Sequence, residues 1–456
     1  MVAGEGQPSG RIETPVDVST WALPRVSEYD AIDRLGSLGS VWSGPDETTV
    51  ITGGITERLT ATGPARFQHV RDEANALFDR LSPEDLPDPA RPRLFGGFSF
   101  FDANYLNTPW EAFPPAMFVL PRWQVAITEE NTWVTVTDAG EPDTRSTEAE
   151  LHRIRTALED GSGTPEIPPG ILRSTPRVDA ETWKEHVGEI VSAIDDGALE
   201  KAVLAYALEV ELRDAFTLGS VYEELSETYP GCFRFAFSPH ESGIESGDAV
   251  FFGASPERLV SKSGQSVNSD ALAGTVPRSE DGVSSTELSK RLRSDPKMQA
   301  EHAVVVEHIR DRLSTVSSDV RVSDRRVRRL ETVQHLQSGI EATVDEATHV
   351  LELVDRLHPT PAVGGVPPEA AMATIERLES LDRGWYAAPV GWFDANGDGT
   401  FAVGIRSALA NDRTATVFAG NGIVADSDPD DEFDEVQLKF SPVLDHLKRG
   451  SSETEQ

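Results

Sequence analysis

One lysine and one glutamate are placed where the fold must control their charge. Lys201 begins the apolar run KAVLAYAL, and burial there would disfavour the ammonium form, so that the amine could act as a general base. A strand-edge lysine that reaches solvent is the alternative. Glu257 follows a Gly-Ala-Ser-Pro turn, from which an acid can reach into a cleft, although a solvated turn acid fits the local pattern as well.

Two further glutamates could hold a metal ion. Glu301 and Glu435 lie beside the apolar faces of expected helices, with no Cys or His cluster near either. Carboxylates alone suit a hard cation such as Mg²⁺. Two solvated helix acids would give the same spacing, so the pattern leaves both interpretations open.

Anion-binding groups are expected near the C-terminal end. Arg406 lies in the apolar stretch FAVGIRSALA, which we expect to be a strand, and a buried arginine needs either a ligand carboxylate or a structural ion pair. The residues Gly420-Asn421-Gly422 are expected to follow a strand, where their backbone N–H groups could approach an anion or form a plain turn. Asn396-Gly-Asp-Gly resembles part of a calcium loop, but the full ligand pattern is absent, which indicates a hairpin turn.

Apolar periodicity predicts the elements that position these residues. We expect a strand over Lys201–Leu212, a small-residue loop over Ala271–Thr275, a helix over Ser285–Thr315 interrupted or restarted at Pro296, and a helix over Glu432–Leu447 kinked or restarted at Pro442. Elsewhere we expect a strand pair over Thr48–Ala61, two strands over Met117–Val136, three short strands over Arg383–Val424, and a linker or surface loop at 159–170. Residues 1 to about 45 show no clear period apart from a short helix near Ser27–Leu38.

The charge balance excludes some partners. The 456 residues carry a formal net charge of -36, which argues against nucleic acid and against anionic membrane surfaces as partners. The acids are spread along the whole chain, as in proteins that stay soluble at high salt, so we expect a halophilic host and a stability that rises with salt.

Composition favours a cytoplasmic enzyme. Hydrophobic residues make up 38% of the chain, enough for a sizeable core, and no apolar run is long enough to span a membrane. The polar first residues do not resemble a signal peptide. Cys232 is the single cysteine, so neither an intrachain disulfide nor a cysteine metal site is expected.

Several motifs together resemble the chorismate-utilising enzymes, over roughly residues 180–445. They are LEKAVLA, FGASPERL, DALAGT, AEHAVVVEHI, LHPTPAVGG, GWYAAPVGW through IRSAL, and AGNGIVADSDPDDEFDEVQLK. In the N-terminal half only GGFSFFDAN and FVLPRW are similar to the family.

Within this family, the resemblance implies an isochorismate synthase, which is an isomerase. Amide-forming relatives carry glutamine where this chain has Lys201, and the lysine accompanies water as the nucleophile. The sequence His358–Ala362 is of the form found in isochorismate and salicylate synthases. A salicylate synthase is the nearest alternative, and anthranilate or aminodeoxychorismate synthase is less compatible. A non-catalytic binding protein on the same fold is disfavoured by the intact acid and base.

The resemblance also implies roles for the acid, the base and the metal ligands. Lys201 would deprotonate the water that attacks C2 of chorismate, and Glu257 would protonate the departing C4 hydroxyl. Mg²⁺ held by Glu301 and Glu435 would bind the ring carboxylate, and Glu432 could assist through water.

Substrate-binding roles are implied in the same way. Arg406 and Lys439 would bind the substrate carboxylates with help from the backbone at Gly274, Thr275 and Gly420, and His335 would line the pocket near the ring. One departure is Tyr206, which stands where many relatives have arginine.

The fold implied by the resemblance is α+β: a large two-layer antiparallel β-sandwich with helices on the outside. We expect one domain over residues 1–445, with a less characteristic half at 1–170, a motif-bearing half at 175–445, and a disordered tail at 446–456. The family further implies a monomer whose isochorismate supplies menaquinone or siderophore synthesis, of which we favour menaquinone.

Overall fold

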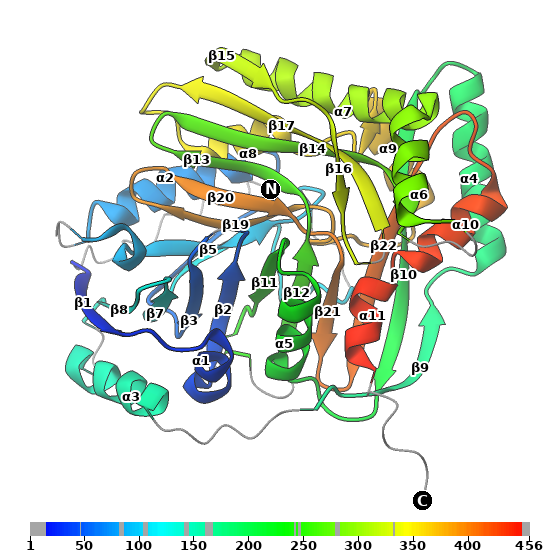
Figure 1. Cartoon of the computed structure of the whole chain (residues 1–456). Coiled ribbons are helices and arrows are strands. Elements are labelled where there is room, and N and C mark those ends of the chain that lie inside the picture. Colours follow the sequence, from blue (N-terminus) through cyan, green and yellow to red (C-terminus); the bar gives the residue numbers. More distant parts are fainter. Residues whose placement is uncertain are drawn as a thin grey trace, which may run out of the picture.

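Two large antiparallel sheets form the centre of the computed structural model, with helices on their outer sides (Figure 1). The structure describes residues 15–45, 47–81, 86–103, 108–140, 146–159, 167–240, 243–244, 248–278, 283–331 and 333–448. Most of the expected loop at 159–170 and of the expected tail at 446–456 lies outside these ranges. The expected α+β sandwich is confirmed.

The first sheet has 12 strands, drawn from both ends of the chain. Its order is β1 (Asp17–Pro24), β8 (Asn131–Asp138), β7 (Trp123–Ile127), β3 (Thr49–Gly53), β2 (Leu38–Ser43), β11 (Phe233–Phe237), β12 (Ala249–Ser255), β21 (Ser407–Asn411), β22 (Thr414–Ile423), β10 (Lys201–Leu212) and β18 (Gly365–Val366), with β9 (Ile171–Pro176) also paired to β10.

The second sheet has 10 strands and is likewise built from both halves of the chain. Its order is β15 (Ser317–Val322), β17 (Val333–Val344), β14 (Ser266–Pro277), β13 (Arg258–Ser263), β20 (Gly399–Val403), β19 (Pro389–Asp394), β5 (Arg93–Phe98), β6 (Ala116–Leu120) and β4 (Glu57–Ala61), with β16 (Arg326–Arg329) paired to β17.

Helices cover the outer face of each sheet. The 12-stranded sheet is contacted by α1 (Glu28–Leu35), α3 (Thr147–Glu159), α4 (Ala180–Asp195), α5 (Leu218–Thr228), α9 (Pro368–Leu378) and α10 (Pro429–Leu438). The 10-stranded sheet is contacted by α2 (Arg66–Phe78), α6 (Ser285–Ser294), α7 (Pro296–Ser314) and α8 (Val350–Leu357), while α11 (Ser441–Leu447) packs on α5. None of the helices in the described ranges is both long and apolar enough to cross a membrane.

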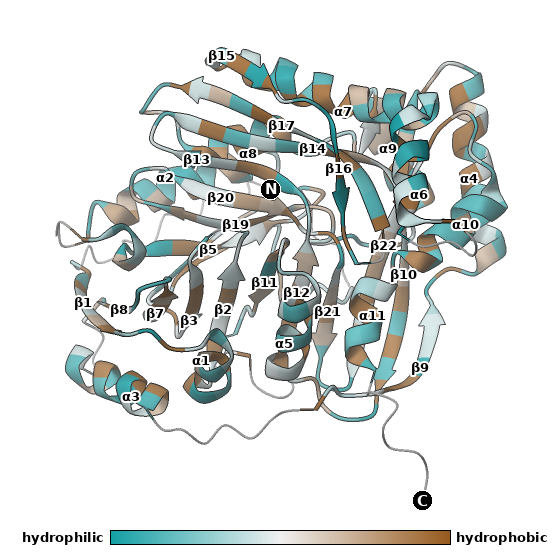
Figure 2. Ribbon diagram, viewed as in Figure 1, coloured by the Kyte–Doolittle hydropathy of each residue, from teal (hydrophilic) through white to brown (hydrophobic). Residues whose placement is uncertain are grey.

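Side chains alternate between two apolar layers. Phe251 points into the layer between the sheets, where it meets Trp385 and Phe235, whereas Val250 and Phe252 belong to the layer under the helices. Successive strand residues face opposite sides of a sheet, so a strand buried on both faces is apolar throughout. Figure 2 shows the result, with hydrophobic positions along the central strands and hydrophilic ones on the outer helices.

Proline-led caps explain where the helices of the motif-bearing half begin. Asp295 accepts hydrogen bonds from the N–H groups of Lys297 and Met298 at 2.8 and 3.2 Å, and Pro296 occupies the first turn of α7. Asp428 caps α10 in the same way ahead of Pro429. The expected restart at Pro296 is therefore confirmed.

Some of the expected strand arrangements are wrong, because the strands pair with partners that are distant in the sequence. Thr48–Ala61 does not form a pair: β3 joins β2 and β7 in one sheet, whereas β4 pairs with β6 in the other. Met117–Val136 holds three strands, since the chain turns at Pro121 between β6 and β7. Arg383–Val424 holds four strands, and the N-terminal segment contributes β1 and β2 as well as the expected helix.

Candidate functional site

A cavity of about 130 Å³ lies where the two sheets face each other near β10 and β14. This volume is roughly ten times what one water needs, so the cavity can take part of a small ligand. Every residue expected to act in catalysis or substrate binding lines it, and so does one of the two expected metal ligands: Lys201, Glu257, Gly274, Thr275, Glu301, His335, Arg406, Gly420 and Lys439. Glu435 does not line the cavity.

Lys201 enters the cavity from the first residue of β10. Its side chain is 6% exposed, and its Nζ donates to Oε1 of Glu301 at 2.8 Å. Lys201 and Val203 line the cavity together because they are two residues apart on one strand face. Gly422 on the neighbouring β22 leaves the space for the lysine, since a Cβ there would lie 2.5 Å from Cε of Lys201. The expected solvent-reaching alternative is excluded by this burial.

Glu257 is buried, which excludes the alternative of a solvated turn acid. It follows β12 in the short connection to β13 and is 4% exposed, and its N–H donates to Oγ of Ser255 at 3.2 Å. Burial raises the pKa of Glu257 to about 8, Asp270 adds to the rise, and the charge of Lys201 opposes it. The carboxyl group therefore keeps its proton at neutral pH and can serve as an acid.

Arg406 is not within a strand, as the sequence suggested, but in the break between β20 and β21. Its backbone has φ 51°, a conformation that non-glycine residues adopt at a cost and that is typically found at functional sites. One terminal nitrogen, Nη2, contacts Nε2 of His335 at 2.8 Å. The other, Nη1, is buried without a hydrogen-bond partner among the described residues. An anion in the cavity would satisfy that donor.

His335 is neutral and has a defined tautomer. Burial lowers its pKa well below the ordinary value, and Arg406 and Lys439 lower it further. A guanidinium can only donate, so Nε2 accepts and the proton lies on Nδ1. Nδ1 is 3.0 Å from Oγ1 of Thr275 and donates to it. The hydroxyl hydrogen of Thr275 is then free to turn toward a ligand.

A bulge presents Thr275 and Gly274 to the cavity. The sequence suggested a loop over Ala271–Thr275, but these residues belong to β14, whose register against β17 shifts between Ala273 and Thr275. Gly274 is the extra residue and has φ 72°, which glycine adopts without the steric cost of a side chain.

The carboxylates beside Lys201 differ in environment. Burial pushes the pKa of Glu301 up, but the charge and hydrogen bond of Lys201 outweigh it, so the pKa is lowered overall. Burial raises the pKa of Glu432, which accepts a hydrogen bond from Oγ of Ser427 at 2.6 Å.

Glu435 forms an ion pair with Nζ of Lys439, one helical turn further along the chain, at 2.9 Å, and 42% of the Glu435 side chain is exposed. Lys439 also donates to the carbonyl of Gly420 at 3.1 Å.

Asn421 supplies an oxygen near these acids. The sequence placed Gly420-Asn421-Gly422 after a strand, but all of them lie within β22. Nδ2 of Asn421 donates to the backbone carbonyl and to Oε2 of Glu432, at 2.7 and 3.0 Å, which fixes the amide orientation. Its Oδ1 is buried without a partner among the described residues.

Arg383, Tyr386 and Phe418 also line the cavity, and sequence reasoning missed them. No compositional signal marked Arg383, because Asp382 directly precedes it and Glu379 lies one helical turn before it. Tyr386 stacks on Phe418 with ring centroids 5.1 Å apart, and burial raises the pKa of its phenol. These two rings form an apolar wall opposite the charged groups.

Tyr206, the departure from the family pattern, lies away from the cavity under the helices. Its hydroxyl donates to the carbonyl of Val178 at 2.9 Å, and its ring packs against Trp183 and Phe433. The packing there is therefore complete without an arginine.

Comparison with known proteins places the chain among enzymes that act on one substrate class. The family model described as chorismate binding enzyme matches residues 20–448. The isochorismate synthase MenF of Bacillus subtilis is 31% identical over 421 residues, which are 89% of this chain and 87% of that protein. The salicylate biosynthesis isochorismate synthase of Pseudomonas aeruginosa is 33% identical over 436 residues, covering 92% and 89%.

Solved structures agree in fold. A putative 2,3-dihydroxybenzoate-specific isochorismate synthase, DhbC from Bacillus anthracis, has a TM-score of 0.72 and 27% identity, with 90% of this chain and 96% of that chain covered. MenF from Escherichia coli has a TM-score of 0.78 at 22% identity, covering 95% of each chain. The chain belongs to the chorismate binding enzyme family.

Proposed function

We propose that the protein is an isochorismate synthase, an isomerase that converts chorismate to isochorismate. The observation that carries the proposal is the meeting of Lys201 and a protonated Glu257 in one cavity, together with Arg406, whose Nη1 has no hydrogen-bond partner in the part of the chain that the structure describes. Chorismate is a dicarboxylate, so a cavity with an unsatisfied buried guanidinium fits it. The similarity to proteins named isochorismate synthase supports the same conclusion.

The reaction adds a hydroxyl at C2 and removes the one at C4. In its neutral amine form, Nζ of Lys201 takes a proton from water as the water oxygen bonds to C2. The ring double bonds shift, the C4–O bond breaks, and the Glu257 proton passes to the departing oxygen, which leaves as water. Water is consumed and released in equal amounts, so the change is an isomerisation. An acid and a base that act on different carbons of one ring can run both changes together.

Five further residues would bind and orient the substrate. Arg406 and Lys439 would bind its carboxylates, Gly274 and Gly420 would offer backbone groups, and the hydroxyl of Thr275 would donate from the bulge of β14. Neutral His335 would hold Arg406 and Thr275 in place beside the ring. The apolar wall would exclude water from the rest of the cavity.

Magnesium fits the donor set. No three described His, Cys, Asp or Glu side chains are arranged to hold a metal by themselves. Mg²⁺, however, is usually bound by one or two carboxylates together with water and substrate oxygens. Glu301 and Glu435 would hold it, since a carboxylate paired with one lysine keeps further lone pairs. The ion would supply charge neutralisation and orientation at the substrate carboxylate.

A product assay tests the function. The purified protein is incubated with chorismate and Mg²⁺ in high salt, and the products are separated by chromatography, with EDTA as the control. We expect isochorismate that is lost with EDTA. Salicylate with an equal amount of pyruvate would instead indicate a salicylate synthase, and no consumption of chorismate would contradict the proposal. Menaquinone supply, a cytoplasmic location, a monomeric state and one domain over residues 1–445 stay predictions.

A further inference from the structure

A buried ion pair lies at the wall of the cavity, which Arg383 lines and Glu379 does not. The side chains of Arg383 and Glu379 are 0% and 2% exposed, respectively. Arg383 donates through Nε to Oε2 of Glu379 at 2.7 Å and through Nη2 to Oε1 at 2.5 Å. Removing one partner of a buried ion pair strongly destabilises the folded protein, because the other charge is left buried and unpaired. Replacing both partners by apolar residues of similar volume often leaves the free energy of unfolding unchanged, so stability alone is a weak reason for these charges.

The pair fills a gap in the sheet. On one side of β10, β18 pairs with Lys201 and Ala202 only, and β9 begins its pairing at Leu208. Between them the ion pair supplies the missing partners: Nη2 of Arg383 donates to the carbonyl of Val203 at 2.7 Å, and Glu379 accepts from the N–H of Ala205 at 2.7 Å. A buried strand edge needs such partners, and here two side chains take the place of a strand.

The same guanidinium also holds the loop opposite. Nη1 of Arg383 donates to the carbonyl of Val363 at 2.9 Å, and the guanidinium carbon lies 4.2 Å from the ring centroid of Phe100. Val363 and Val203 both line the cavity, and Val203 is two residues from Lys201 on the same strand face. One buried arginine therefore fixes the distance between the strand that carries Lys201 and the loop that forms another wall.

We propose that Arg383 and Glu379 are positioning residues for Lys201: they hold β10 so that the lysine amine meets the water that attacks the substrate. This inference rests on the proposed function. Neither residue is a catalytic residue, because their hydrogen-bonding groups are occupied within the protein. Small displacements of a catalytic group cost up to about a hundredfold in rate.

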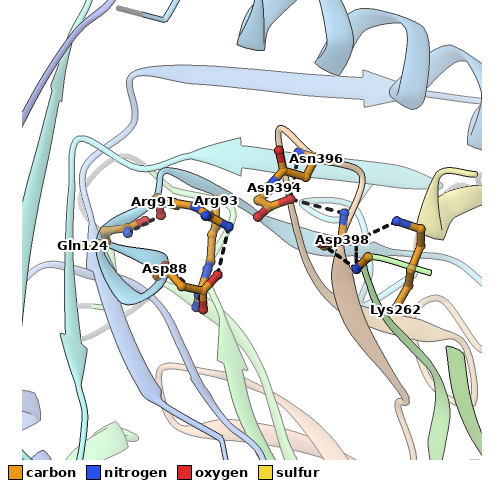
Figure 3. Close-up of polar contacts among 9 residues, drawn as sticks. Asp88, Arg91, Arg93, Gln124, Lys262, Asp394, Asn396 and Asp398 are labelled. Carbon is orange, nitrogen blue, oxygen red and sulfur yellow. Dashed lines mark hydrogen bonds and ion pairs between the residues drawn. The ribbon is translucent and has the colours of Figure 1, made fainter. Parts of the chain in front are cut away.

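An ion pair between buried Lys262 and partly buried Asp398 provides a matched control (Figure 3). Nζ of Lys262 lies 2.6 Å from Oδ1 of Asp398, and Asp398 also accepts from the N–H of Gly264 at 3.0 Å. Glu379 and Asp398 thus each join one buried cation to one backbone amide, but Asp398 is not among the residues that line the cavity. Glu379→Gln and Asp398→Asn remove the same charge with little change in shape.

The kinetic test compares Glu379→Gln and Arg383→Lys with Asp398→Asn. We expect the first two variants to lower kcat for chorismate by about ten- to a hundredfold with KM within about threefold, and the control to change neither. In a Lys201→Ala background, assayed at high enzyme concentration, the same changes should have less than about a twofold effect, because the group they position is gone. The proposal would be overturned if Glu379→Gln and Arg383→Lys lowered kcat equally with and without Lys201. It would also be overturned if neither variant changed kcat in the protein that keeps Lys201, or if neither variant folded.

A second measurement does not depend on turnover. The chain has only seven lysines, so the ammonium signal of Lys201 can be assigned in protein labelled with nitrogen-15 lysine by its loss in Lys201→Ala. Glu379→Gln should shift or broaden this signal, whereas Asp398→Asn should affect that of Lys262 instead. An unchanged Lys201 signal in Glu379→Gln would overturn the positioning role, whether or not the wild-type protein converts chorismate. Failure of the wild-type protein to convert chorismate would refute the proposed function, and this is a separate result.

Discussion

At the scale of single residues, burial rather than sequence neighbours sets the chemistry of the cavity. Glu257 is surrounded so closely that its neutral form is favoured, although Lys201 opposes this. His335 is kept neutral by burial and by the cations beside it. At neutral pH the site therefore holds a protonated carboxylic acid and a neutral imidazole. At the same pH an exposed glutamate would be largely charged, and an exposed histidine would be partly charged.

The protonation of Glu257 predicts how activity depends on pH. The reaction needs the protonated acid, so kcat/KM should fall as pH rises through about 8, the pKa of the free enzyme's Glu257. A rate profile with chorismate from pH 4 to 10 measures this limb. A fall centred near the ordinary carboxyl value of 4.5 would contradict the assignment.

The same proton gives a stability prediction that needs no substrate. The pKa of Glu257 is raised from 4.5 to about 8 by folding, so its contribution is fully present below pH 4.5 and is lost as pH rises toward 8. Glu257→Gln lacks this titration. Urea unfolding at pH 5, 7 and 9 should show wild type losing stability relative to the variant as pH rises. A constant difference between the two proteins would count against a buried neutral acid.

The tautomer of His335 predicts the behaviour of Thr275. Because Nδ1 of His335 donates to the threonine oxygen, the hydroxyl must donate to the substrate. Thr275→Val should raise KM for chorismate by about tenfold, in line with the loss of a hydrogen bond to a charged group. Thr275→Ser keeps the hydroxyl and should stay within about threefold of wild type. An unchanged KM in Thr275→Val, or a larger rise in Thr275→Ser than in Thr275→Val, would contradict the role of the hydroxyl.

At the scale of elements, the pairing of β10 with β22 makes room for the base. A Cβ at Gly422 would lie 3.0 Å from Nζ of Lys201 and 3.4 Å from Oε1 of Glu301. The lysine end is flexible and can move aside, so Gly422→Ala should leave the melting temperature nearly unchanged but lower kcat about tenfold or more. Gly188→Ala, where nothing lies within 4 Å of the new carbon, is the control and should keep full activity. Similar kcat values for both variants would refute the placement of Lys201.

The sequence allowed the local elements and the composition of the cavity to be predicted, because motifs and periodicity are local signals. The strand bearing Lys201 and the helix restart at Pro296 are examples, since each depends on neighbours within a few residues. Pairings across the chain were not accessible: β3 and β4 look like a hairpin, yet they belong to different sheets. Arg406 was expected in a strand because the sequence around it gives no sign that its backbone adopts a positive φ.

At the scale of the whole molecule, the acidic surface is the dominant property. Self-repulsion at a net charge of -36 opposes the compact state, and salt shortens the range of that repulsion from about 10 Å at 0.1 M to about 3 Å at 1 M. The melting temperature should therefore rise between 0.1 and 1 M KCl. Sucrose at equal osmolality, which does not screen charge, is the control and should raise it less. A melting temperature that stays constant or falls in KCl would contradict the expected adaptation to salt.

The central claim is that this cavity adds water to C2 of chorismate with Lys201 as the base. The most direct measurement is to run the reaction in water enriched in heavy oxygen and to locate the label in the product by mass spectrometry. We expect one solvent oxygen at C2 of isochorismate in every turnover, and formation of this product by Lys201→Ala at a rate lower by about a hundred- to ten-thousandfold. Isochorismate whose C2 oxygen came from the substrate, or labelled product formed at the wild-type rate without Lys201, would contradict the account.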